Sequence, residues 1–372
     1  LPKVDKGMLK PMSAFTLIGK DLPRVEVPAK SNGTAQFGID VRLPGMLWAA
    51  ILHAPVQGEK PLTVSDAEAL AVPGVKKVVR LPHGAGVVAD SFFTARKARD
   101  LLKVTWSTES KARSYDSEAA LKQFVARAER LDDAGAVWHK QGDAAQKLAG
   151  ATRVLRATYT SEHVAQTTLE PMNCTARADG DKIEIWVPSQ SPSGVIGVVS
   201  AGAGFKPENI KVNITLLGGG YGRRAEADYS LEAALLAKAM PGVPIQVIWT
   251  REDDFLRSRP RPMTAQHLVA GIDAQGRIVG WRHRLVSESI TARTAPAIYE
   301  KTGGKDSPVM EGSDCVYQIT DQLIEHCREQ RGVDVSFWRA VGAGYTKFAI
   351  ETMIDEIAAS VGKDPLQYRL DM

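Results

Sequence analysis

The chain has 372 residues, of which 44% are apolar and 24% charged. These shares are ordinary for globular domains and exclude wholesale disorder, collagen and coiled coil. The net charge is only +4, and basic residues alternate with acidic ones, so the sequence does not indicate nucleic-acid binding.

The predicted elements before residue 108 form a compact α+β arrangement that follows a loop over residues 1–12. One helix is predicted to begin after Asp66 and a second to run from the cap residue Ser91 to about residue 102. Strands are predicted over residues 25–27, 35–41, 47–52, 75–81, 86–89 and 104–106.

Residues 109–150 are polar and rich in alanine, and they are predicted to form a connector with a helix near Ser117. From residue 151 strands alternate with helices, and a hairpin is predicted around Asp273. The predicted strands cover residues 154–160, 173–178, 182–187, 210–216, 243–249, 266–272 and 277–285. The predicted helices cover residues 189–204, 227–240 and 345–361, and residues 295–313 are predicted to be a loop.

Membrane and metal motifs are weak in this sequence. The longest apolar stretch, residues 194–205, is shorter than the roughly 20 residues that cross a bilayer. No signal peptide is visible, so the compartment, cytoplasm or periplasm, stays open. The three cysteines form no CxxC motif and the histidines no HExxH motif, which predicts no iron–sulfur, structural zinc or haem site and no metal-ligating side chains.

The glycine run Gly218–Gly222, with Tyr221 inside it, is the most distinctive local signal. It follows a predicted strand and precedes a predicted helix, where glycine lets backbone N–H groups approach a ligand closely. The run lacks the Gly-Lys-Ser/Thr of a phosphate-binding loop and the spacing of a dinucleotide fingerprint. A nucleotide-binding protein is therefore an alternative that these patterns argue against.

Arg223 and Arg224 follow the glycine run directly. Two cations at a helix start oppose the helix dipole unless an anion lies beside them. A bound phosphate is one candidate anion, since arginine binds phosphate through paired hydrogen bonds. The other is neutralisation by Glu226 and Asp228, and the sequence does not decide between the two.

Five further features stand at junctions between predicted elements. Glu170, before Pro171, is predicted to have a structural role, whereas the amide of Gln190 could point a donor into a pocket. Residues 251–254 are predicted to be a solvated charge cluster. Prolines on both sides of Arg261 preorganise its guanidinium, and Arg339 lies beside small residues.

The order of these junctions resembles the molybdenum-binding large subunit of the xanthine oxidase family, in the isoquinoline 1-oxidoreductase beta-subunit and aldehyde dehydrogenase branch. The resemblance rests on Glu170-Pro171, Ser189-Gln190, Gly218–Gly222, Arg251–Asp254, Arg259-Pro260 and Trp338–Gly342. The segments 15–26, 33–40 and 43–52 resemble the aldehyde oxidase/xanthine dehydrogenase a/b hammerhead domain. The resemblance implies an N-terminal loop over 1–12, a hammerhead-like domain over 13–108, a connector over 109–150 and the incomplete first part of a molybdopterin-binding domain over 151–372.

The resemblance also implies roles for individual residues. Gln190 would offer its amide to the metal centre, and Arg261 would lie near the substrate. The cofactor would be lined by the backbone of Gly219, Gly220 and Tyr221 on one side and by Arg339, Ala340 and Val341 on the other.

The implied cofactor is molybdopterin with molybdenum, as the cytosine dinucleotide. The family oxidises N-heteroaromatic compounds or aldehydes with water as the oxygen source, and it passes electrons to a small [2Fe-2S] subunit or a cytochrome c subunit. Protein donors stabilise the charge that develops in such a reaction.

Two departures from the family pattern limit the resemblance. The family's general-base glutamate is expected beyond Met372, so no catalytic residue is predicted among residues 1–372. Ala225 stands where purine-oxidising members carry a glutamate. A fragment completed by the remainder of the large subunit, a short subunit completed by another chain, and a non-catalytic module that docks the iron–sulfur subunit stay open.

Overall fold

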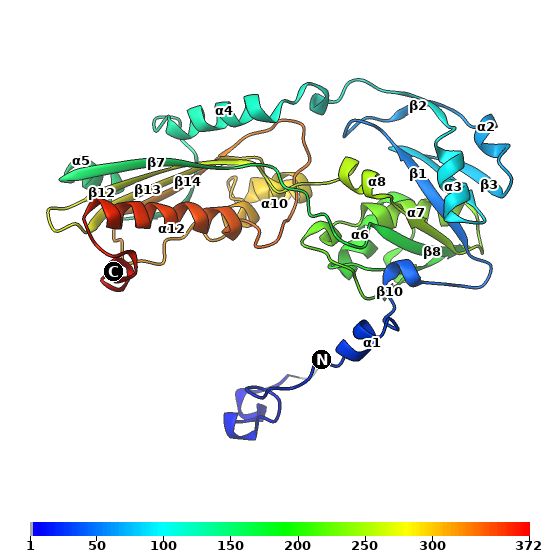
Figure 1. Cartoon of the computed structure of the whole chain (residues 1–372), viewed down its shortest axis with the longest axis horizontal. Coiled ribbons are helices and arrows are strands. Elements are labelled where there is room, and N and C mark those ends of the chain that lie inside the picture. Colours follow the sequence, from blue (N-terminus) through cyan, green and yellow to red (C-terminus); the bar gives the residue numbers. More distant parts are fainter. Residues whose placement is uncertain (1–2) are drawn as a thin grey trace.

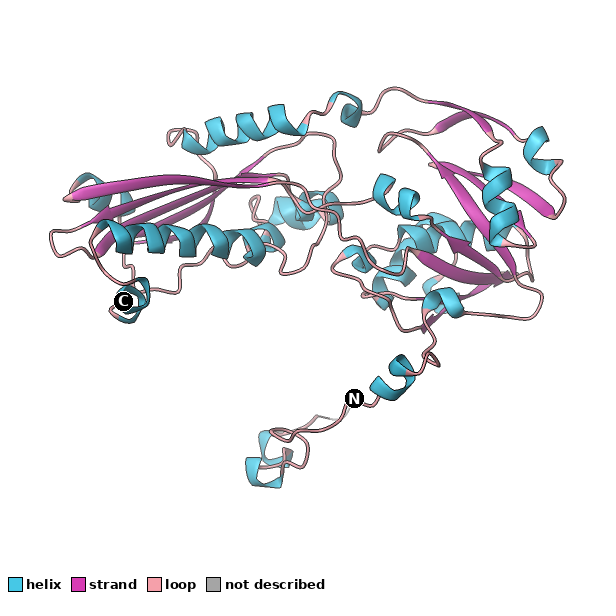
Figure 2. Cartoon of the chain, in the orientation of Figure 1, coloured by secondary structure: helices cyan, strands magenta, loops and turns pink. Residues whose placement is uncertain are grey.

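The computed structural model describes residues 3–372, which form two lobes side by side and an N-terminal segment that extends away from them (Figure 1). Each lobe is built on one large β-sheet with helices packed against it, as the colouring of Figure 2 makes plain. The predicted α+β class is therefore confirmed.

The first lobe contains a seven-stranded sheet in the order β10-β9-β8-β11-β1-β4-β3 and a two-stranded sheet of β2 and β5. The strands are β1 (Leu47–His53), β2 (Pro61–Ser65), β3 (Val75–Leu81), β4 (Gly84–Ala89), β5 (Lys103–Trp106), β8 (Asn173–Asp179), β9 (Lys182–Val187), β10 (Ile210–Ile214) and β11 (Ile245–Ile248). The helices are α2 (Ala67–Leu70), α3 (Phe92–Arg99), α6 (Pro192–Ala203), α7 (Asp228–Ala239) and α8 (Arg251–Leu256).

Alternating residues of β1 explain how this sheet is covered on both faces. Ala49 and Ile51 belong to the core that contains α6 and α7, whereas Ala50 packs in a separate cluster with Ala95 of α3. Successive side chains of a strand point to opposite faces, so the helices cover opposite sides of β1.

The second lobe contains a five-stranded sheet in the order β6-β14-β13-β12-β7. Its strands are β6 (Ala136–Gln141), β7 (Arg153–Ser161), β12 (Thr264–Ile272), β13 (Ile278–Ser287) and β14 (Gln322–Arg328). Its helices are α4 (Ser117–Glu129), α5 (Ala144–Ala149), α9 (Ile290–Thr294), α10 (Pro296–Lys301), α11 (Ser307–Met310), α12 (Ala343–Ser360) and α13 (Pro365–Leu370). On β12, Ala265 packs toward α4 whereas Leu268 and Ala270 pack toward α12, so these two helices cover opposite faces.

Several predicted elements are wrong. Residues 25–27 are not a strand, because Val27 already belongs to the short helix α1 (Val27–Ser31), whose first turn contains Pro28. Residues 35–41 are not a strand but contain a 3₁₀ turn over Gly38–Asp40, with a single bridge from Phe37 to Leu216. Residues 295–313 are helical in part, since they contain α10 and α11.

The predicted connector over residues 109–150 is part of the second lobe. Its strand β6 pairs antiparallel with β14, and its helix α4 packs on β12 and β13. Both β6 and β14 escaped prediction because their alternation is broken by polar residues such as Glu325 and His326, which are buried here.

The proposed domain boundary near residue 108 does not separate two sheets. β1 pairs in parallel with β11, so strands from before and after the boundary share one sheet. The division into hammerhead-like and molybdopterin-binding parts stays a prediction.

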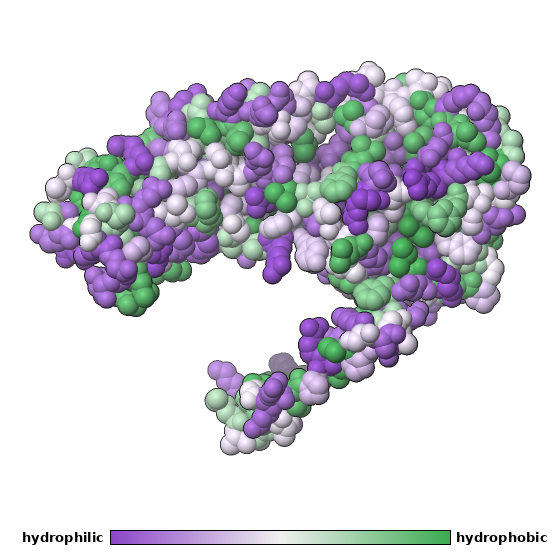
Figure 3. Space-filling view, viewed as in Figure 1, coloured by the Kyte–Doolittle hydropathy of each residue, from purple (hydrophilic) through white to green (hydrophobic). Residues whose placement is uncertain are grey.

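The N-terminal segment, residues 3–34, leaves the body of the molecule (Figure 3) and exposes apolar side chains such as Met12 and Val25. No helix within residues 3–372 has both the length and the apolar character to cross a bilayer.

Candidate cofactor-binding site

The predicted site residues lie on loops at the junction of the two lobes. The glycine run leaves β10, Gln190 follows β9, and Arg339–Val341 precede α12. The chain also crosses between the lobes after β7 and after α8, where Figure 1 shows the connections running close together.

The carboxylate of Glu170 connects several of the segments around the glycine run. Its carboxylate accepts hydrogen bonds from Ile39 N (3.0 Å), Asn173 Nδ2 (2.9 Å), Gly218 N (2.7 Å) and Arg224 Nη2 (3.0 Å). The side chain is buried, so all of its acceptor capacity serves the protein. The predicted structural role of Glu170 is confirmed.

Arg224 is enclosed by carbonyl oxygens. It donates to Gly219 O (2.8 Å), Pro188 O (3.2 Å) and Glu170 O (2.8 Å), and the Glu170 carboxylate neutralises its charge. These bonds hold the glycine run against the loop that carries Gln190.

Arg223 is equally buried, and its guanidinium donates two hydrogen bonds of 2.9 Å to the carboxylate of Asp228. Neither guanidinium is available to a phosphate, so the bound-phosphate alternative is wrong for these two arginines. The predicted neutralisation is confirmed for Asp228 but not for Glu226, which instead binds Arg259 and Arg293.

Opposing effects set the protonation of these two carboxyl groups. Burial alone would raise the pKa of Glu226 and of Asp228, but the neighbouring arginines outweigh burial and lower both. Both groups are therefore carboxylates near neutral pH, which keeps the guanidinium cluster behind the glycine run electrically balanced.

Gln190 and the glycine run are in direct contact. Gln190 Oε1 accepts a hydrogen bond from Gly222 N at 3.0 Å, and a Cβ on Gly220 would lie 2.4 Å from the same oxygen. The Gln190 side chain is exposed, and its Nε2 donates to no group within residues 3–372. This amide N–H is thus available to a ligand.

The backbone of the predicted site is strained. In the described part of the chain, four residues other than glycine have positive φ, and three of them are Tyr221 (50°), Ala340 (67°) and Val341 (47°). Such conformations cost roughly 1–3 kcal/mol each and occur preferentially at functional sites. The fourth, Thr167 (46°), lies in the neighbouring crossover segment.

The loop before α12, which contains Phe337 and Arg339–Val341, also contacts the glycine run through its backbone. A Cβ on Gly222 would lie 2.3 Å from Phe337 O, so only glycine lets the two loops approach. Beyond Phe337, Arg339 is exposed and forms no ion pair with any other described residue. Arg261 lies over the Trp338 ring at 5.3 Å, which places it at the same junction.

No sequence pattern pointed to Gln166, which connects two of these loops. Its Nε2 donates to Arg259 O (2.8 Å) and Phe337 O (2.7 Å). Its partners lie 93 and 171 residues away in the chain, so no local pattern could reveal them.

The predicted solvated charge cluster over residues 251–254 is only partly solvated: Glu252 is exposed, whereas its neighbours are bonded within the protein. Arg251 donates to Thr168 O (2.5 Å), Asp253 pairs with Arg99, and both Asp253 and Asp254 are buried. Thr250 caps this short helix, α8, and the ion pairs fix it beside the crossover segment.

The structure also brings together three potential metal ligands: His53, His83 and Glu232. The prediction that no side chains cluster as metal ligands is therefore wrong. The residues come from three distant parts of the sequence and no short motif links them. Burial opposes ionisation of Glu232, but the two histidines outweigh it and lower its pKa.

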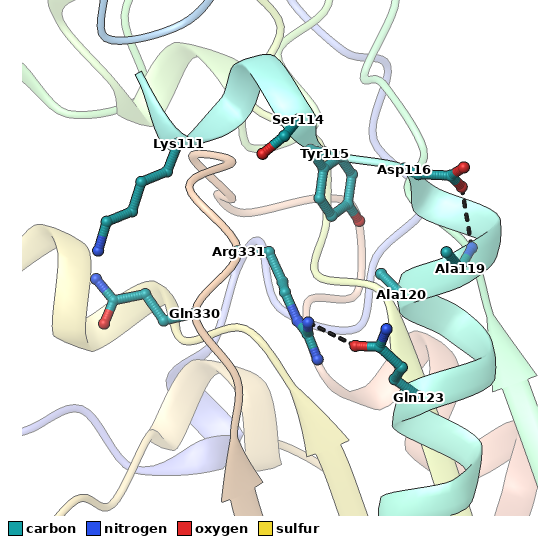
Figure 4. A pocket seen from close by; sticks show the side chains of 9 residues that line it. All are labelled: Lys111, Ser114, Tyr115, Asp116, Ala119, Ala120, Gln123, Gln330 and Arg331. Atoms are coloured by element: carbon teal, nitrogen blue, oxygen red, sulfur yellow. Dashed lines mark hydrogen bonds between the residues drawn. The ribbon is translucent and has the colours of Figure 1, made fainter. Parts of the chain in front are cut away.

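A separate hollow of about 360 Å³ lies between the start of α4 and the loop after β14 (Figure 4). Arg331 reaches across it to Gln123 Oε1 at 2.7 Å. None of the predicted site residues lines this hollow.

Comparisons with known proteins identify the family of this chain. The model of the molybdopterin cofactor-binding domain matches residues 129–371. The beta subunit of isoquinoline 1-oxidoreductase from Brevundimonas diminuta is 35% identical over 370 residues, which cover 97% of this chain and 47% of that protein. A membrane-bound aldehyde dehydrogenase from Gluconacetobacter polyoxogenes is 30% identical, over 98% of this chain and 49% of its own length.

Among solved structures, quinoline 2-oxidoreductase from Pseudomonas putida 86 matches with a TM-score of 0.76 and 21% identity, over 94% of this chain and 49% of that one. The chain spans about half the length of the curated relatives given above.

Proposed function

Because the chain belongs to the xanthine oxidase family of molybdopterin cofactor-binding proteins, we propose that it forms part of the large subunit of a molybdenum hydroxylase. The observation that carries this proposal is the contact between Gln190 and the glycine run, at a junction that holds donors without a partner within residues 3–372.

The residues at the junction fit a pterin-held metal. Gln190 Nε2 and the N–H groups of Gly219, Gly220 and Tyr221 form no hydrogen bond with residues 3–372. Arg339, on the opposite loop, adds an exposed guanidinium, the group best suited to the phosphates of a pterin dinucleotide such as the cytosine form. Ala340 and Val341 would contribute their backbone beside it.

When bound, the molybdenum cofactor supplies the two-electron oxidation, with water as the source of oxygen. This chain's residues orient the cofactor and offer preorganised donors to the negative charge that develops during reaction. The buried Glu170 and Arg224 keep those donors in place.

We propose an N-heteroaromatic compound or an aldehyde as the substrate. The named activities of the isoquinoline and aldehyde relatives support this class. Ala225 offers no charged group to a purine, and Arg261 is held over Trp338 at the same junction.

The general base is proposed to come from outside residues 1–372. Two candidate carboxylates are already engaged: Glu170 by four donors, and Glu351 by Tyr317 and Arg369. Electrons are proposed to leave through a separate [2Fe-2S] subunit or a cytochrome c subunit.

The proposal is tested with the variant Gly220→Ala in the holoenzyme. The new methyl group must displace the end of the Gln190 side chain, which is flexible, so the fold should survive while the site is disturbed. Gly197→Ala in α6 is the matched control, because nothing lies within 4 Å of a Cβ there.

We expect Gly220→Ala to lose molybdenum and pterin, or to lose turnover, by at least about 10-fold, equivalent to one donor. Gly197→Ala should behave as wild type in both measurements. Full cofactor content and full turnover in Gly220→Ala would refute the assignment of the site.

A further inference from the structure

Two imidazoles and a carboxylate meet in the first lobe, next to Trp249. His53 Nε2 lies 2.8 Å and His83 Nε2 lies 2.7 Å from the same oxygen, Glu232 Oε1. One ligand atom from each residue lies within 4.8 Å of the other two. The proposed cofactor site does not use these residues.

The fold gives each ligand a rigid support. His53 ends β1, and its neighbour His83 stands in the β3–β4 turn, where His53 pairs with Gly84 in the antiparallel register. A Cβ on Gly84 would lie 2.3 Å from Leu52 O, so this glycine lets the turn press against β1. The two imidazole rings consequently stack at 6.0 Å, and α7 presents Glu232 to both.

Trp249 orients the carboxylate. Its Nε1 donates to Glu232 Oε2 at 2.7 Å, which leaves Oε1 directed at the two histidines. An outer hydrogen bond of this kind fixes the ligand oxygen in many metal sites. The ring of Trp249 also packs edge-on against His53 at 5.0 Å.

The buried charge of Glu232 and the solvent access through His83 both favour binding of a cation. Glu232 is 1% exposed, and Arg223, whose guanidinium lies 5.4 Å from the Trp249 ring, is already paired with Asp228. A buried carboxylate needs a nearby positive charge, which either protonated imidazoles or a cation bound between neutral imidazoles can supply. The His83 side chain, 23% exposed, opens the cluster to solvent.

We propose that His53, His83 and Glu232 bind one divalent transition-metal cation, with water completing its coordination. Two imidazoles and one carboxylate favour zinc or iron over magnesium or calcium, which prefer oxygen ligands alone. The cation would link β1, the β3–β4 turn and α7, and so stabilise the packing of α7 on the sheet of the first lobe. This site is independent of the proposed molybdenum site.

The test measures zinc and molybdenum together in tag-free holoprotein that has been loaded with Zn²⁺ and stripped of excess metal. Wild type should retain about one more Zn²⁺ per chain than His83→Gln, a variant of the partly exposed ligand that should fold. His139→Gln, on the edge strand β6, is the matched control and should retain zinc as wild type does. Molybdenum content should be equal in all three proteins.

A second variant separates a metal site from a purely hydrogen-bonded cluster. Trp249→Phe keeps the aromatic packing but removes the N–H that orients Glu232, and it should weaken Zn²⁺ binding by roughly 10- to 100-fold. Co²⁺ loaded in place of Zn²⁺ should give a visible absorption spectrum that His83→Gln abolishes.

Equal zinc content in wild type and His83→Gln, or no Co²⁺ spectrum in wild type, would overturn the proposal. If molybdenum is absent from all variants while zinc follows His83, the molybdenum assignment fails and the zinc site stands.

Discussion

Two sets of polar residues around the glycine run differ in how their hydrogen-bonding capacity is used. Behind the run, Glu170, Arg223 and Arg224 are buried and bonded to protein groups. In front of it, Gln190 and Arg339 are exposed and keep donors unpaired among the described residues. The buried set fixes the loops, and the exposed set is left to act on a ligand.

This difference gives opposite expectations for substitutions only a few ångströms apart. Changes in the buried set should lower the free energy of unfolding. Changes in the exposed set should leave stability intact and alter function, because an exposed side chain contributes little to folding and water can replace the hydrogen bond that Gln190 accepts from Gly222 N.

The largest effect is expected from Glu170→Ala. It leaves Arg224 without its carboxylate and Gly218 N without its acceptor, and breaking a buried ion pair in this way costs about 3–5 kcal/mol. The free energy of unfolding from denaturant titration measures the loss.

Glu68→Ala provides the matched comparison, since both side chains of the Glu68–Lys103 ion pair are exposed to solvent. Exposed pairs contribute about 0–1 kcal/mol. Comparable losses from the two variants would contradict the anchoring role of Glu170.

The exposed set is tested by Gln190→Ala in the holoenzyme. Loss of one preorganised donor should lower turnover by about 10- to 1000-fold, while molybdenum content and unfolding free energy stay near wild type. Steady-state kinetics with metal analysis on the same preparation measure both. Unchanged turnover would remove Gln190 from the site.

A buried carboxyl outside both sets supplies a pH test. Burial raises the pKa of Glu288 to about 7 from its usual 4.5, and the neighbouring His163, 3.6 Å away, has a lowered pKa and is neutral at that pH. The folded state therefore holds the Glu288 proton more tightly than the unfolded chain does.

Stability should consequently fall as pH rises from about 4.5 to 7, by up to about 3 kcal/mol for a shift of this size, and then level off. Glu288→Gln removes this titration, so unfolding measured across that range should lose this part of its pH dependence. Identical pH profiles for wild type and Glu288→Gln would show that the carboxyl titrates normally.

The smallest effect is expected from relieving backbone strain at Ala340, in the loop before α12. Ala340 has φ of 67°, which costs an L-residue about 1–2 kcal/mol and glycine nothing. Glycine also loses about 0.5–1 kcal/mol of chain entropy, so Ala340→Gly should stabilise the fold slightly.

Ala359→Gly, at an exposed position of α12 with helical backbone, should instead destabilise by up to about 1 kcal/mol. A loss of stability in both variants, measured by thermal unfolding, would show that Ala340 is not strained.

The sequence predicted the parts of this structure that depend on local pattern. Strands such as β8 and β9 and the helix after Ser91 follow from alternation and capping, and the order of junction motifs predicted the family. The sequence missed Gln166, the role of Arg251 and the His53–His83–Glu232 cluster, because each depends on partners far away in the chain. It also misplaced strands at residues 25–27 and 35–41, where apolar residues lie outside any sheet.

The central claim is that Gln190, the glycine run and Arg339–Val341 surround a pterin-held molybdenum. Anomalous diffraction at the molybdenum absorption edge, from crystals of the holoenzyme, locates the metal directly. The account predicts a single molybdenum peak beside the Gln190 side chain, between the glycine run and the loop before α12. A molybdenum peak at any other place in the structure, with these loops in contact with solvent alone, would contradict it.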